Sequence, residues 1–273
     1  MNDATGIIEA FIRERLDACG TPLTVGLCGA QGSGKTTVAA TVVAGLEASG
    51  LHAVALSIDD LYLSRAERLA LAERVHPLLV TRGVPGTHDL ALGLSLLRQF
   101  RARQPLTLPR FDKAQDDRMG DAQWTHDDRP ADVLIFEGWC VGAVPQDAPD
   151  LMLPANALER DHDADGRWRA YVNDQLAGGY QTLFGALDTL ILLAAPGFEI
   201  VHRWRTQQED DLAARQPAGS ALMDTAQISR FIQHYERLTR HILAEMPTRA
   251  DLTIFLDEDR RVTGSARRPK GTT

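Results

Sequence analysis

Residues 29–36 read Gly29-Ala30-Gln31-Gly32-Ser33-Gly34-Lys35-Thr36 and match the pattern G-x-x-x-x-G-K-[ST] at every fixed position. They follow an apolar run, 23–28, and open a helical segment, 35–49, which is the context that this pattern requires. The glycines allow backbone N–H groups to converge on a phosphate at the N-terminus of that helix. Lys35 can then reach the β- and γ-phosphates, and the Thr36 hydroxyl can bind Mg²⁺. The sequence therefore predicts a nucleoside triphosphate site formed by Gly29, Ala30, Gln31, Gly32, Ser33, Gly34, Lys35, Thr36 and Thr37.

The segments around this motif alternate between short apolar runs and amphipathic helical patterns. Buried strands are expected at 23–28, 52–58, 132–136, 187–193 and 252–256, and helices at 3–18, 35–49, 89–103 and 223–246. The helix at 89–103 would take Thr87 or Asp89 as its cap. Near-continuous apolar strands joined by helices are typical of a parallel sheet covered on both faces. The expected fold class is α/β, a doubly wound P-loop NTPase-type sheet of about five parallel strands.

Two strands end in carboxylates at the edge of the sheet where open α/β folds bind ligands. The run Val133-Leu134-Ile135-Phe136 ends in Glu137, which can support the metal together with Thr36, unless it is simply a surface residue. The strand ending at Ile58 delivers Asp59 and Asp60, and a carboxylate there can accept the proton of an attacking hydroxyl. Both acids could instead cap the following helix. We expect Asp59 to point into the site and Asp60 to support it.

Composition limits the class of partner. The 273 residues carry a formal net charge of −8 and 44% hydrophobic residues, which fits a globular domain and disfavours nucleic-acid or anionic-membrane partners. The three cysteines are widely spaced and form no zinc or disulfide pattern. The apolar runs are too short to span a membrane, and the first residues do not resemble a signal peptide. We expect a cytoplasmic protein. Only three of its 29 basic residues are lysines, Lys35, Lys113 and Lys270.

Several segments depart from the strand–helix pattern within what we expect to be one domain, 1–273. A helix at 1–20 precedes the first strand, and segments 104–130 and 143–185 interrupt the pattern. Long irregular segments in a compact domain are usually functional or mobile. The basic residues after Asp259 predict a flexible tail at 260–273.

Four stretches together resemble the phosphoribulokinase, uridine kinase and pantothenate kinase superfamily. They are the phosphate loop, Ser57-Ile58-Asp59-Asp60-Leu61-Tyr62, Phe136-Glu137-Gly138-Trp139 and Arg203-Trp204-Arg205. Two more stretches are similar to the D-glycerate 3-kinase group: Arg82-Gly83-Val84-Pro85-Gly86-Thr87-His88-Asp89-Leu90 and Leu108-Pro109-Arg110-Phe111-Asp112-Lys113. The resemblance covers about 23–258. It implies an ATP-dependent kinase that phosphorylates a hydroxyl of a small anionic acceptor, with D-glycerate first among the candidates.

The resemblance also implies roles for individual residues. Asp59 matches the catalytic base, and Lys35 and a lid arginine would neutralise charge on the transferred phosphoryl group. The resemblance places segments 104–130 and 143–185 on the acceptor side and implies a lid at 197–222. Arg203 and Arg205 match the lid arginines that close over the phosphates, and Arg203 is assigned to nucleotide binding. Because the two lie two apart on a helix, we expect only one, Arg205, to reach the γ-phosphate. The substrate-binding set is Asp59, Tyr62, Arg82, Thr87, His88, Asp89, Arg110, Asp112 and Lys113.

Some assignments stay open at this level. Arg82 and Arg110 could be solvated surface charges, and His88 could be no more than the neighbour of a helix cap. Trp168, Tyr171 and Tyr180 could cover a ligand or belong to the core. The acceptor could be a nucleoside, pantothenate or a sugar phosphate, and an NTP-driven switch or assembly ATPase is the alternative outside the small-molecule kinases.

Overall fold

A computed structural model describes residues 4–215 and 225–269 and places the phosphate loop beside the middle of a sheet. In these residues the main sheet has six strands in the order β10-β9-β8-β1-β7-β2. The strands are β1 (Leu23–Gly29), β2 (Ala53–Ser57), β7 (Val133–Gly138), β8 (Thr189–Ala194), β9 (Leu252–Leu256) and β10 (Val262–Arg267). The first five pair in parallel, and β10 runs antiparallel to β9. The predicted α/β class and its five parallel strands are confirmed.

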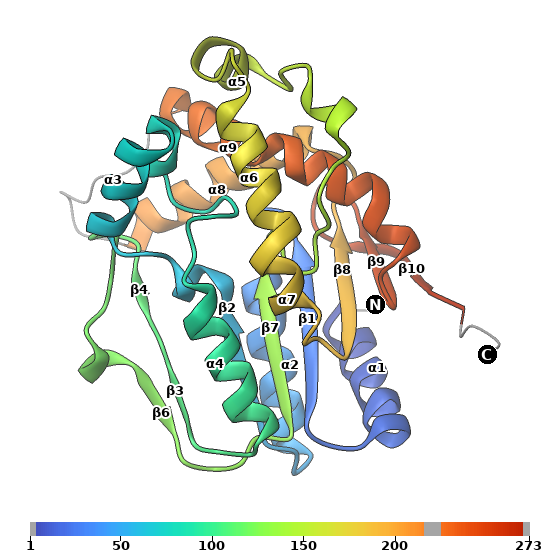
Figure 1. The fold of residues 1–273 in the computed structure, drawn as a ribbon. Coiled ribbons are helices and arrows are strands. Elements are labelled where there is room, and N and C mark those ends of the chain that lie inside the picture. Colours follow the sequence, from blue (N-terminus) through green and yellow to red (C-terminus); the bar gives the residue numbers. More distant parts are fainter. Residues whose placement is uncertain (1–3, 216–224, 270–273) are drawn as a thin grey trace.

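Helices cover both faces of the sheet, as Figure 1 shows, with α4, α6 and α7 in front of it and α2 behind. The α-helices are α1 (Ala4–Cys19), α2 (Lys35–Ala48), α3 (Arg65–Arg74), α4 (Leu90–Arg101), α5 (Ala157–His162), α6 (Arg167–Gln175), α7 (Gln181–Phe184), α8 (Glu199–Arg215) and α9 (Thr225–Glu245). Asp89 caps α4 by accepting a hydrogen bond from the Leu92 N–H. Helix α3, which begins with a Ser64–Glu67 capping box, was not among the predicted helices.

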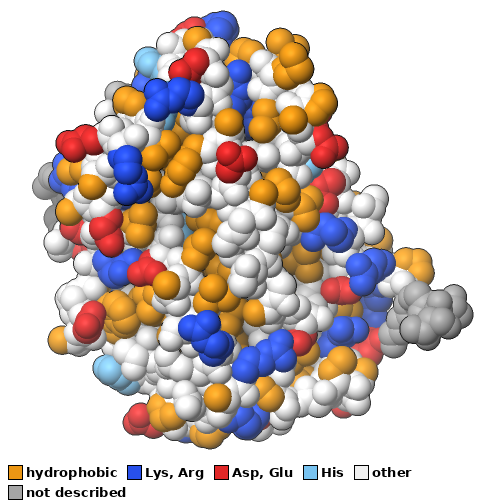
Figure 2. Space-filling view, in the orientation of Figure 1, with side chains coloured by type: hydrophobic (Ala, Val, Ile, Leu, Met, Phe, Trp, Pro, Cys, Tyr) orange, Lys and Arg blue, Asp and Glu red, His pale blue; other side chains and the backbone are white. Residues whose placement is uncertain are grey.

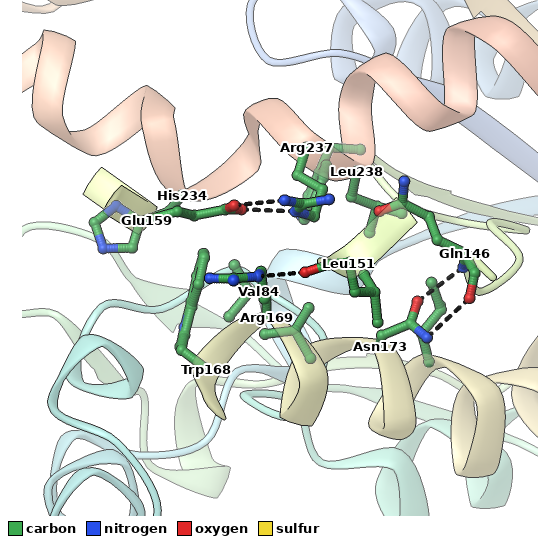
Figure 3. A pocket seen from close by; sticks show the side chains of 13 residues that line it. Val84, Gln146, Leu151, Glu159, Trp168, Arg169, Asn173, His234, Arg237 and Leu238 are labelled. Carbon is green, nitrogen blue, oxygen red and sulfur yellow. Dashed lines mark hydrogen bonds and ion pairs between the residues drawn. The ribbon is translucent and has the colours of Figure 1, made fainter. Parts of the chain in front are cut away.

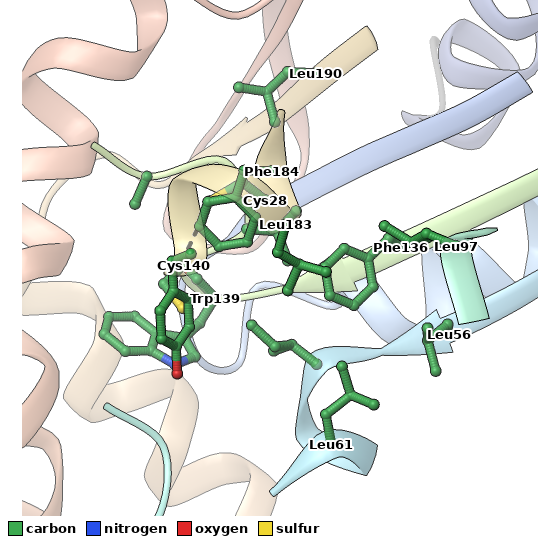
Figure 4. Close-up of a cluster of buried hydrophobic side chains, with 14 of the residues drawn as sticks. Cys28, Leu56, Leu61, Leu97, Phe136, Trp139, Cys140, Leu183, Phe184 and Leu190 are labelled. Carbon is green, nitrogen blue, oxygen red and sulfur yellow. Dashed lines mark hydrogen bonds between the residues drawn. The ribbon is translucent and has the colours of Figure 1, made fainter. Parts of the chain in front are cut away.

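The core consists of two hydrophobic layers because alternate strand residues point to opposite faces. Leu134 and Phe136 of β7 pack in the layer that includes α4 and part of α9, while Val133 and Ile135 pack in the layer of α1 and α2. Figure 4 shows part of the first layer, where Phe136 and Leu97 lie beside Leu183. Every residue of β1, β7 and β8 is buried. This two-sided burial explains why these strands read as continuous apolar runs.

The irregular segment at 104–130 forms two small antiparallel ladders beside the main sheet. Strand β3 (Leu106–Leu108) pairs with β6 (Thr125–Asp127), and β4 (Phe111–Asp112) pairs with β5 (Asp117–Arg118). Short 3-10 turns fill the connections: η1 (Ile58–Leu61), η2 (Pro77–Val80), η3 (Asp121–Gln123), η4 (Ala148–Leu151) and η6 (Met246–Thr248), with a π-turn η5 (Leu176–Tyr180). The β4–β5 turn carries Lys113 toward the carboxyl end of β2.

The C-terminal segment corrects the prediction of a flexible tail at 260–273. Residues 262–267 form β10 along β9, and Arg267 makes an ion pair with Glu14 of α1. The turn between the two strands is fixed by Asp257, whose Oδ1 accepts hydrogen bonds from the backbone N–H groups of Asp259 and Arg261. Strand β10 is exposed and has few apolar residues, so hydrophobic patterning gives no signal for it. Residues 270–273 of the predicted tail lie outside the described part of the chain.

Helix α8 covers most of the predicted lid at 197–222, and the remainder, 216–222, lies outside the described residues. No helix within 4–215 or 225–269 has the length and apolar character needed to cross a membrane. On the face shown in Figure 2, basic and acidic side chains are interspersed among apolar ones.

Candidate active site

The phosphate loop lies between β1 and α2, and its glycines adopt backbone conformations that other residues avoid. Gly32 and Gly34 have φ values of 76° and 85°, in the left-handed region, and Gly34 is the N-cap of α2. A side chain at Gly32 would collide with helix α8, because an added Cβ would lie 2.6 Å from the Cβ of Trp204. The loop is therefore held in a conformation that opens the N-terminus of α2 toward a ligand.

Polar side chains at the phosphate loop are buried without partners. The Ser33 hydroxyl and the side-chain amide of Gln31 are buried and make no hydrogen bond with any described residue. A cleft of about 950 Å³ opens beside them, lined on one side by loop and α2 residues and on the other by Gln207, Leu256, Arg260 and Val262. Buried polar atoms without partners are costly unless a ligand or water satisfies them. The cleft is large enough for a nucleotide.

Thr36 and Glu137 meet where β1 and β7 end side by side. The Thr36 hydroxyl donates a 2.9 Å hydrogen bond to Oε1 of Glu137, and the register pairs Leu27 with Glu137. Glu137 is 2% exposed, and its second oxygen, Oε2, is buried with no partner among the described residues. A hydroxyl and a buried carboxylate with an unsatisfied oxygen form a donor set that suits a hard divalent cation. Thr36 and Glu137 therefore provide oxygen ligands suited to the divalent metal that the sequence predicts for them.

Asp59 lies at the end of β2 on the turn η1, and both of its carboxylate oxygens are engaged. Oδ1 accepts a 2.6 Å hydrogen bond from the Tyr62 hydroxyl, and Oδ2 lies 2.6 Å from Nζ of Lys113. Burial would raise the pKa of Asp59, but the nearby Lys113 and Lys35 ammonium groups and the two hydrogen bonds hold it below its usual value. Asp59 is therefore ionised, and the influence of Lys35 shows that it lies close to the phosphate loop.

Asp60 points elsewhere and anchors the β3–β4 segment. Its Oδ1 accepts a 3.1 Å hydrogen bond from the Phe111 N–H, and its Oδ2 lies 3.1 Å from Nη1 of Arg110. Burial raises the pKa of Asp60, against the opposing effect of these two partners. Of the two adjacent acids, Asp59 faces Lys113 and Tyr62, whereas Asp60 fixes the strip that carries Lys113. Arg110 is engaged in this anchor.

Arg82 and His88 complete a group that we call the acceptor cluster: Asp59, Tyr62, Arg82, His88 and Lys113. Arg82 makes an ion pair with Asp116 and lies over the Phe111 ring, 5.6 Å from its centre.

His88 packs against Tyr62, with 4.9 Å between ring centres, and its Nδ1 lies 2.5 Å from the Tyr180 hydroxyl. Its Nε2 is buried without a partner among the described residues, and burial lowers the pKa of His88 to about 4.

Three of the residues predicted to bind substrate make hydrogen bonds that fix the local backbone. The Thr87 hydroxyl accepts a hydrogen bond from the Gly83 N–H and donates one to the Val84 carbonyl, which closes the 82–87 loop. Asp89 caps α4 and pairs with Arg118. Asp112 accepts hydrogen bonds from the next turn, at Ala114 and Gln115. Thr87 is fully buried, so it shapes the loop that presents Arg82 and His88.

The two lid arginines lie in different surroundings, as their spacing on α8 predicts. Arg203 makes ion pairs with Glu258 and Asp259 in the turn after β9. Arg205 donates to Gln208 and lies over the Phe231 ring, 5.6 Å from its centre. The Phe231 ring packs against Tyr235, with 5.0 Å between ring centres, and the Tyr235 hydroxyl donates to the Arg82 carbonyl, so Arg205 lies on the same side of the molecule as Arg82.

Sequence reasoning missed Arg260, which supports the phosphate loop from behind. Its Nε donates a 2.5 Å hydrogen bond to the Gly32 carbonyl, and its guanidinium lies 5.1 Å from the centre of the Trp204 ring. Trp204 in turn donates to the Glu258 carbonyl. Arg260 belongs to the predicted tail, and a turn arginine between two strands carries no motif that could have identified it.

A second, smaller cavity of about 20 Å³ lies between α6 and α9 (Figure 3). It is bordered by the buried Glu159–Arg237 ion pair and by Trp168 and His234, whose ring nitrogens Nε1 and Nε2 have no partner among the described residues. This volume suits about one water molecule. Trp168 and Tyr180, at 2% and 0% exposed, are core residues rather than a cover over a ligand.

One edge of the sheet carries a phosphate loop, a carboxylate beside it and a group of cationic side chains. Together these features define an ATP-dependent P-loop kinase. The signature of the Phosphoribulokinase / Uridine kinase family matches residues 24–152. The chain is 33% identical over 267 residues to the uncharacterized kinase mug58 of Schizosaccharomyces pombe, covering 93% of this chain and 94% of that protein. The chain belongs to the phosphoribulokinase/uridine kinase family.

Two further comparisons concern D-glycerate 3-kinases. The chloroplastic enzyme of Arabidopsis thaliana is 28% identical over 257 residues, covering 88% of this chain, which spans about half (53%) of that longer protein. The solved structure of D-glycerate 3-kinase from Cryptococcus neoformans var. grubii superposes with a TM-score of 0.80 at 25% identity, covering 98% of this chain and 100% of that one. The family uses ATP with a divalent metal and a small-molecule substrate.

Proposed function

We propose that this kinase transfers the γ-phosphoryl group of ATP to a hydroxyl of D-glycerate. The observation that carries the proposal is the acceptor cluster, in which a partly buried carboxylate, Asp59, lies 2.6 Å from a lysine on a surface turn. Glycerate has one carboxylate and two hydroxyls, so its site needs a cation for the acid group and a base for the hydroxyl. The similarity to two D-glycerate 3-kinases supports this choice of acceptor.

In the proposed reaction the acceptor hydroxyl attacks the γ-phosphorus while the bond to the bridging oxygen of ADP breaks. Asp59 orients this hydroxyl and takes its proton, and the Tyr62 hydroxyl holds the carboxylate in position through Oδ1. Burial and the Asp59 charge raise the pKa of Tyr62 well above its usual value, so the phenol remains a donor. Lys113 and Arg82 provide the cations for the acceptor carboxylate, and a planar guanidinium can bind it in bidentate fashion.

Charge that develops on the phosphoryl oxygens is balanced from the nucleotide side. Lys35 and the N–H groups of the phosphate loop contact the β- and γ-phosphates, and Arg205 is the lid arginine assigned to the transferred group. Thr36 and Glu137 would hold Mg²⁺, which supplies neutralisation of the phosphate charge when it is bound. The remaining substrate-side residues act through structure: Arg110 anchors Asp60, and Thr87, Asp89 and Asp112 shape the loops.

The test is product identification by NMR after incubation of the protein with MgATP and D-glycerate. A new phosphomonoester resonance that assigns to phosphoglycerate supports the proposal, and its couplings identify the hydroxyl that was modified. Uridine, pantothenate and a sugar phosphate are the parallel acceptors, with ADP release as the common readout. Phosphorylation of one of these in place of glycerate would refute the choice of acceptor and leave the kinase assignment unaffected.

A further inference from the structure

The proposed base is paired with a cation of the same chain. The Asp59 Oδ2 to Lys113 Nζ distance is 2.6 Å, and the second oxygen receives the Tyr62 hydroxyl at 2.6 Å. A carboxylate held by an ammonium group has a reduced affinity for a further proton, because the cation favours its charged form. In this arrangement Asp59 is a poor base for a hydroxyl or for water.

The two partners of Asp59 differ in their freedom to leave. Tyr62 is 4% exposed and is packed between the rings of His88 and Phe111. The Lys113 side chain is 60% exposed and projects from the turn between β4 and β5. A flexible four-carbon stem lets an ammonium group swing over several ångströms without moving the backbone. Lys113 is therefore the partner that can be displaced.

The turn that carries Lys113 is held firmly, so only the side chain needs to move. Asp60 binds the Phe111 N–H from below, and Asp112 accepts hydrogen bonds from the Ala114 and Gln115 N–H groups within the turn. Arg118 donates to the Tyr62 carbonyl at 2.9 Å and joins β5 to η1. A fixed turn with a mobile ammonium group places a cation where an incoming anion meets it beside Asp59.

We propose that Lys113 is an exchangeable counter-ion of Asp59, which it leaves only when the acceptor supplies an anionic group in exchange. The exchange replaces one carboxylate–ammonium pair by another, so its electrostatic cost is small for an anionic acceptor and large for a neutral one or for water. The pair would then select acidic acceptors and suppress hydrolysis of ATP in their absence. This inference rests on the proposed role of Asp59 and on an anionic acceptor, and it goes beyond simple binding of that anion by Lys113.

The suppressed side reaction defines the first test. With water as the acceptor, its oxygen attacks the γ-phosphorus, the bond to ADP breaks, Asp59 takes the proton, and ADP and inorganic phosphate leave. Removing the cation in Lys113→Met should raise acceptor-free ATP hydrolysis roughly tenfold, because the base regains its proton affinity. Lys113→Arg keeps the positive charge and should raise hydrolysis less than Lys113→Met does. Arg101→Met is the matched control. It removes an exposed cation in the last turn of α4 that makes an ion pair with Asp188.

The double variant Asp59→Asn/Lys113→Met identifies the group that is released. It should lose the added hydrolysis, because the base is then absent. An unchanged or lower rate of hydrolysis in Lys113→Met would overturn the proposal, and so would added hydrolysis that persists in the double variant. This measurement uses ATP alone, so it gives a result even if D-glycerate proves not to be the acceptor.

The second test compares D-glycerate with its neutral amide, D-glyceramide, as acceptors. The wild type should turn over the amide poorly, since Lys113 stays on Asp59. Lys113→Met should lower kcat/KM for glycerate about a hundredfold and raise kcat for the amide several-fold. A lysine that only binds the acid group would lower the first value and leave the second unchanged, and that outcome would reduce Lys113 to a binding residue.

Discussion

The phosphate-loop end of the cleft is one uninterrupted segment, Gly29 to Thr36, whereas the acceptor cluster draws its side chains from three separate segments. Asp59 comes from η1 and Tyr62 from the residue that follows it, Arg82 and His88 come from the loop before α4, and Lys113 comes from the β4–β5 turn. The first region binds through backbone N–H groups and relies on left-handed glycines. The second binds through side chains whose positions depend on hydrogen bonds and ion pairs across the chain.

This difference predicts which measured property a substitution in each region will change. A change in the phosphate loop should affect nucleotide binding directly, because the local backbone is itself the binding group. A change in the acceptor cluster should leave nucleotide binding nearly intact and affect turnover or acceptor affinity. The following experiments are ordered by the size of the effect that we expect.

Asp59→Asn should separate the two regions most clearly. The amide cannot take the proton of the acceptor hydroxyl, so kcat should fall by about 10³-fold, while the affinity for ATP should change less than about threefold. Coupled measurement of ADP release and calorimetric titration of a non-hydrolysable ATP analogue check the two values. Turnover near the wild-type level would show that another group is the base.

Lys35→Ala should affect both binding and turnover. Lys35 is the phosphate-loop cation, and its loss should reduce kcat/KM for ATP by about 10²- to 10³-fold and weaken the binding of the analogue in the same titration. An unaltered titration curve would contradict the assignment of the loop as the nucleotide site.

Gly32→Ala tests whether the backbone conformation of the loop matters as much as its charge. The new Cβ would meet Trp204 at 2.6 Å in a left-handed residue, so we expect a loss of about 1–3 kcal/mol in the free energy of unfolding, with weaker ATP binding. Gly120→Ala is the matched control, since Gly120 has a φ of −65° and nothing within 4 Å of the added Cβ. Equal stability of the two variants would rule out the collision.

Stability at low pH should report on the acceptor cluster through His88. Its pKa is about 4 in the folded chain against an ordinary value of 6.5, because burial disfavours the imidazolium. Between these values the unfolded chain binds a proton that the folded chain does not, so stability falls as the pH drops. The loss should be about 2 kcal/mol between pH 7 and pH 5. Urea denaturation at each pH measures the free energy of unfolding. Between pH 7 and pH 5, His88→Gln should lose about 2 kcal/mol less of it than the wild type. Equal losses in the two proteins would refute the assignment of His88 as a buried, neutral imidazole.

Asp60→Ala should give the smallest effect, one confined to the acceptor side. Without Asp60 the Phe111 N–H and Arg110 lose their anchor, so the turn that carries Lys113 becomes less fixed. We expect KM for the acceptor to rise about tenfold with KM for ATP unchanged. A matching rise in KM for ATP would mean that the anchor supports both regions equally.

Much of the fold could be predicted because buried parallel strands are apolar on both faces and leave a plain signal. The five parallel strands were identified in this way, and the edge strand β10 was not, because it is exposed and polar. The capped helix α3 was also missed, since its sequence RAERLALAER has a weak apolar face. The sequence offered Thr87 or Asp89 as the cap of α4, and Asp89 is the residue that caps it.

The candidate site was partly accessible from sequence. Thr36 and Glu137 were paired by strand position alone, and they lie in hydrogen-bond contact. The resemblance assigned Thr87, Asp89 and Asp112 to the substrate, but sequence similarity cannot distinguish a residue that touches a ligand from one that shapes the loop around it. Arg260 had no recognisable pattern, because its partner, the Gly32 carbonyl, is 228 positions away in the chain.

The sequence by itself determined the phosphate loop, the parallel sheet and the meeting of three strand ends at one edge. These follow from local rules: glycine geometry, apolar periodicity and the direction of parallel strands. Only the tertiary structure decided that Lys113 lies on Asp59, that Asp60 fixes the strip beneath it, and that Arg260 supports the loop. Those contacts join residues about fifty to more than two hundred positions apart, and folding of the whole chain is what brings such charges within reach.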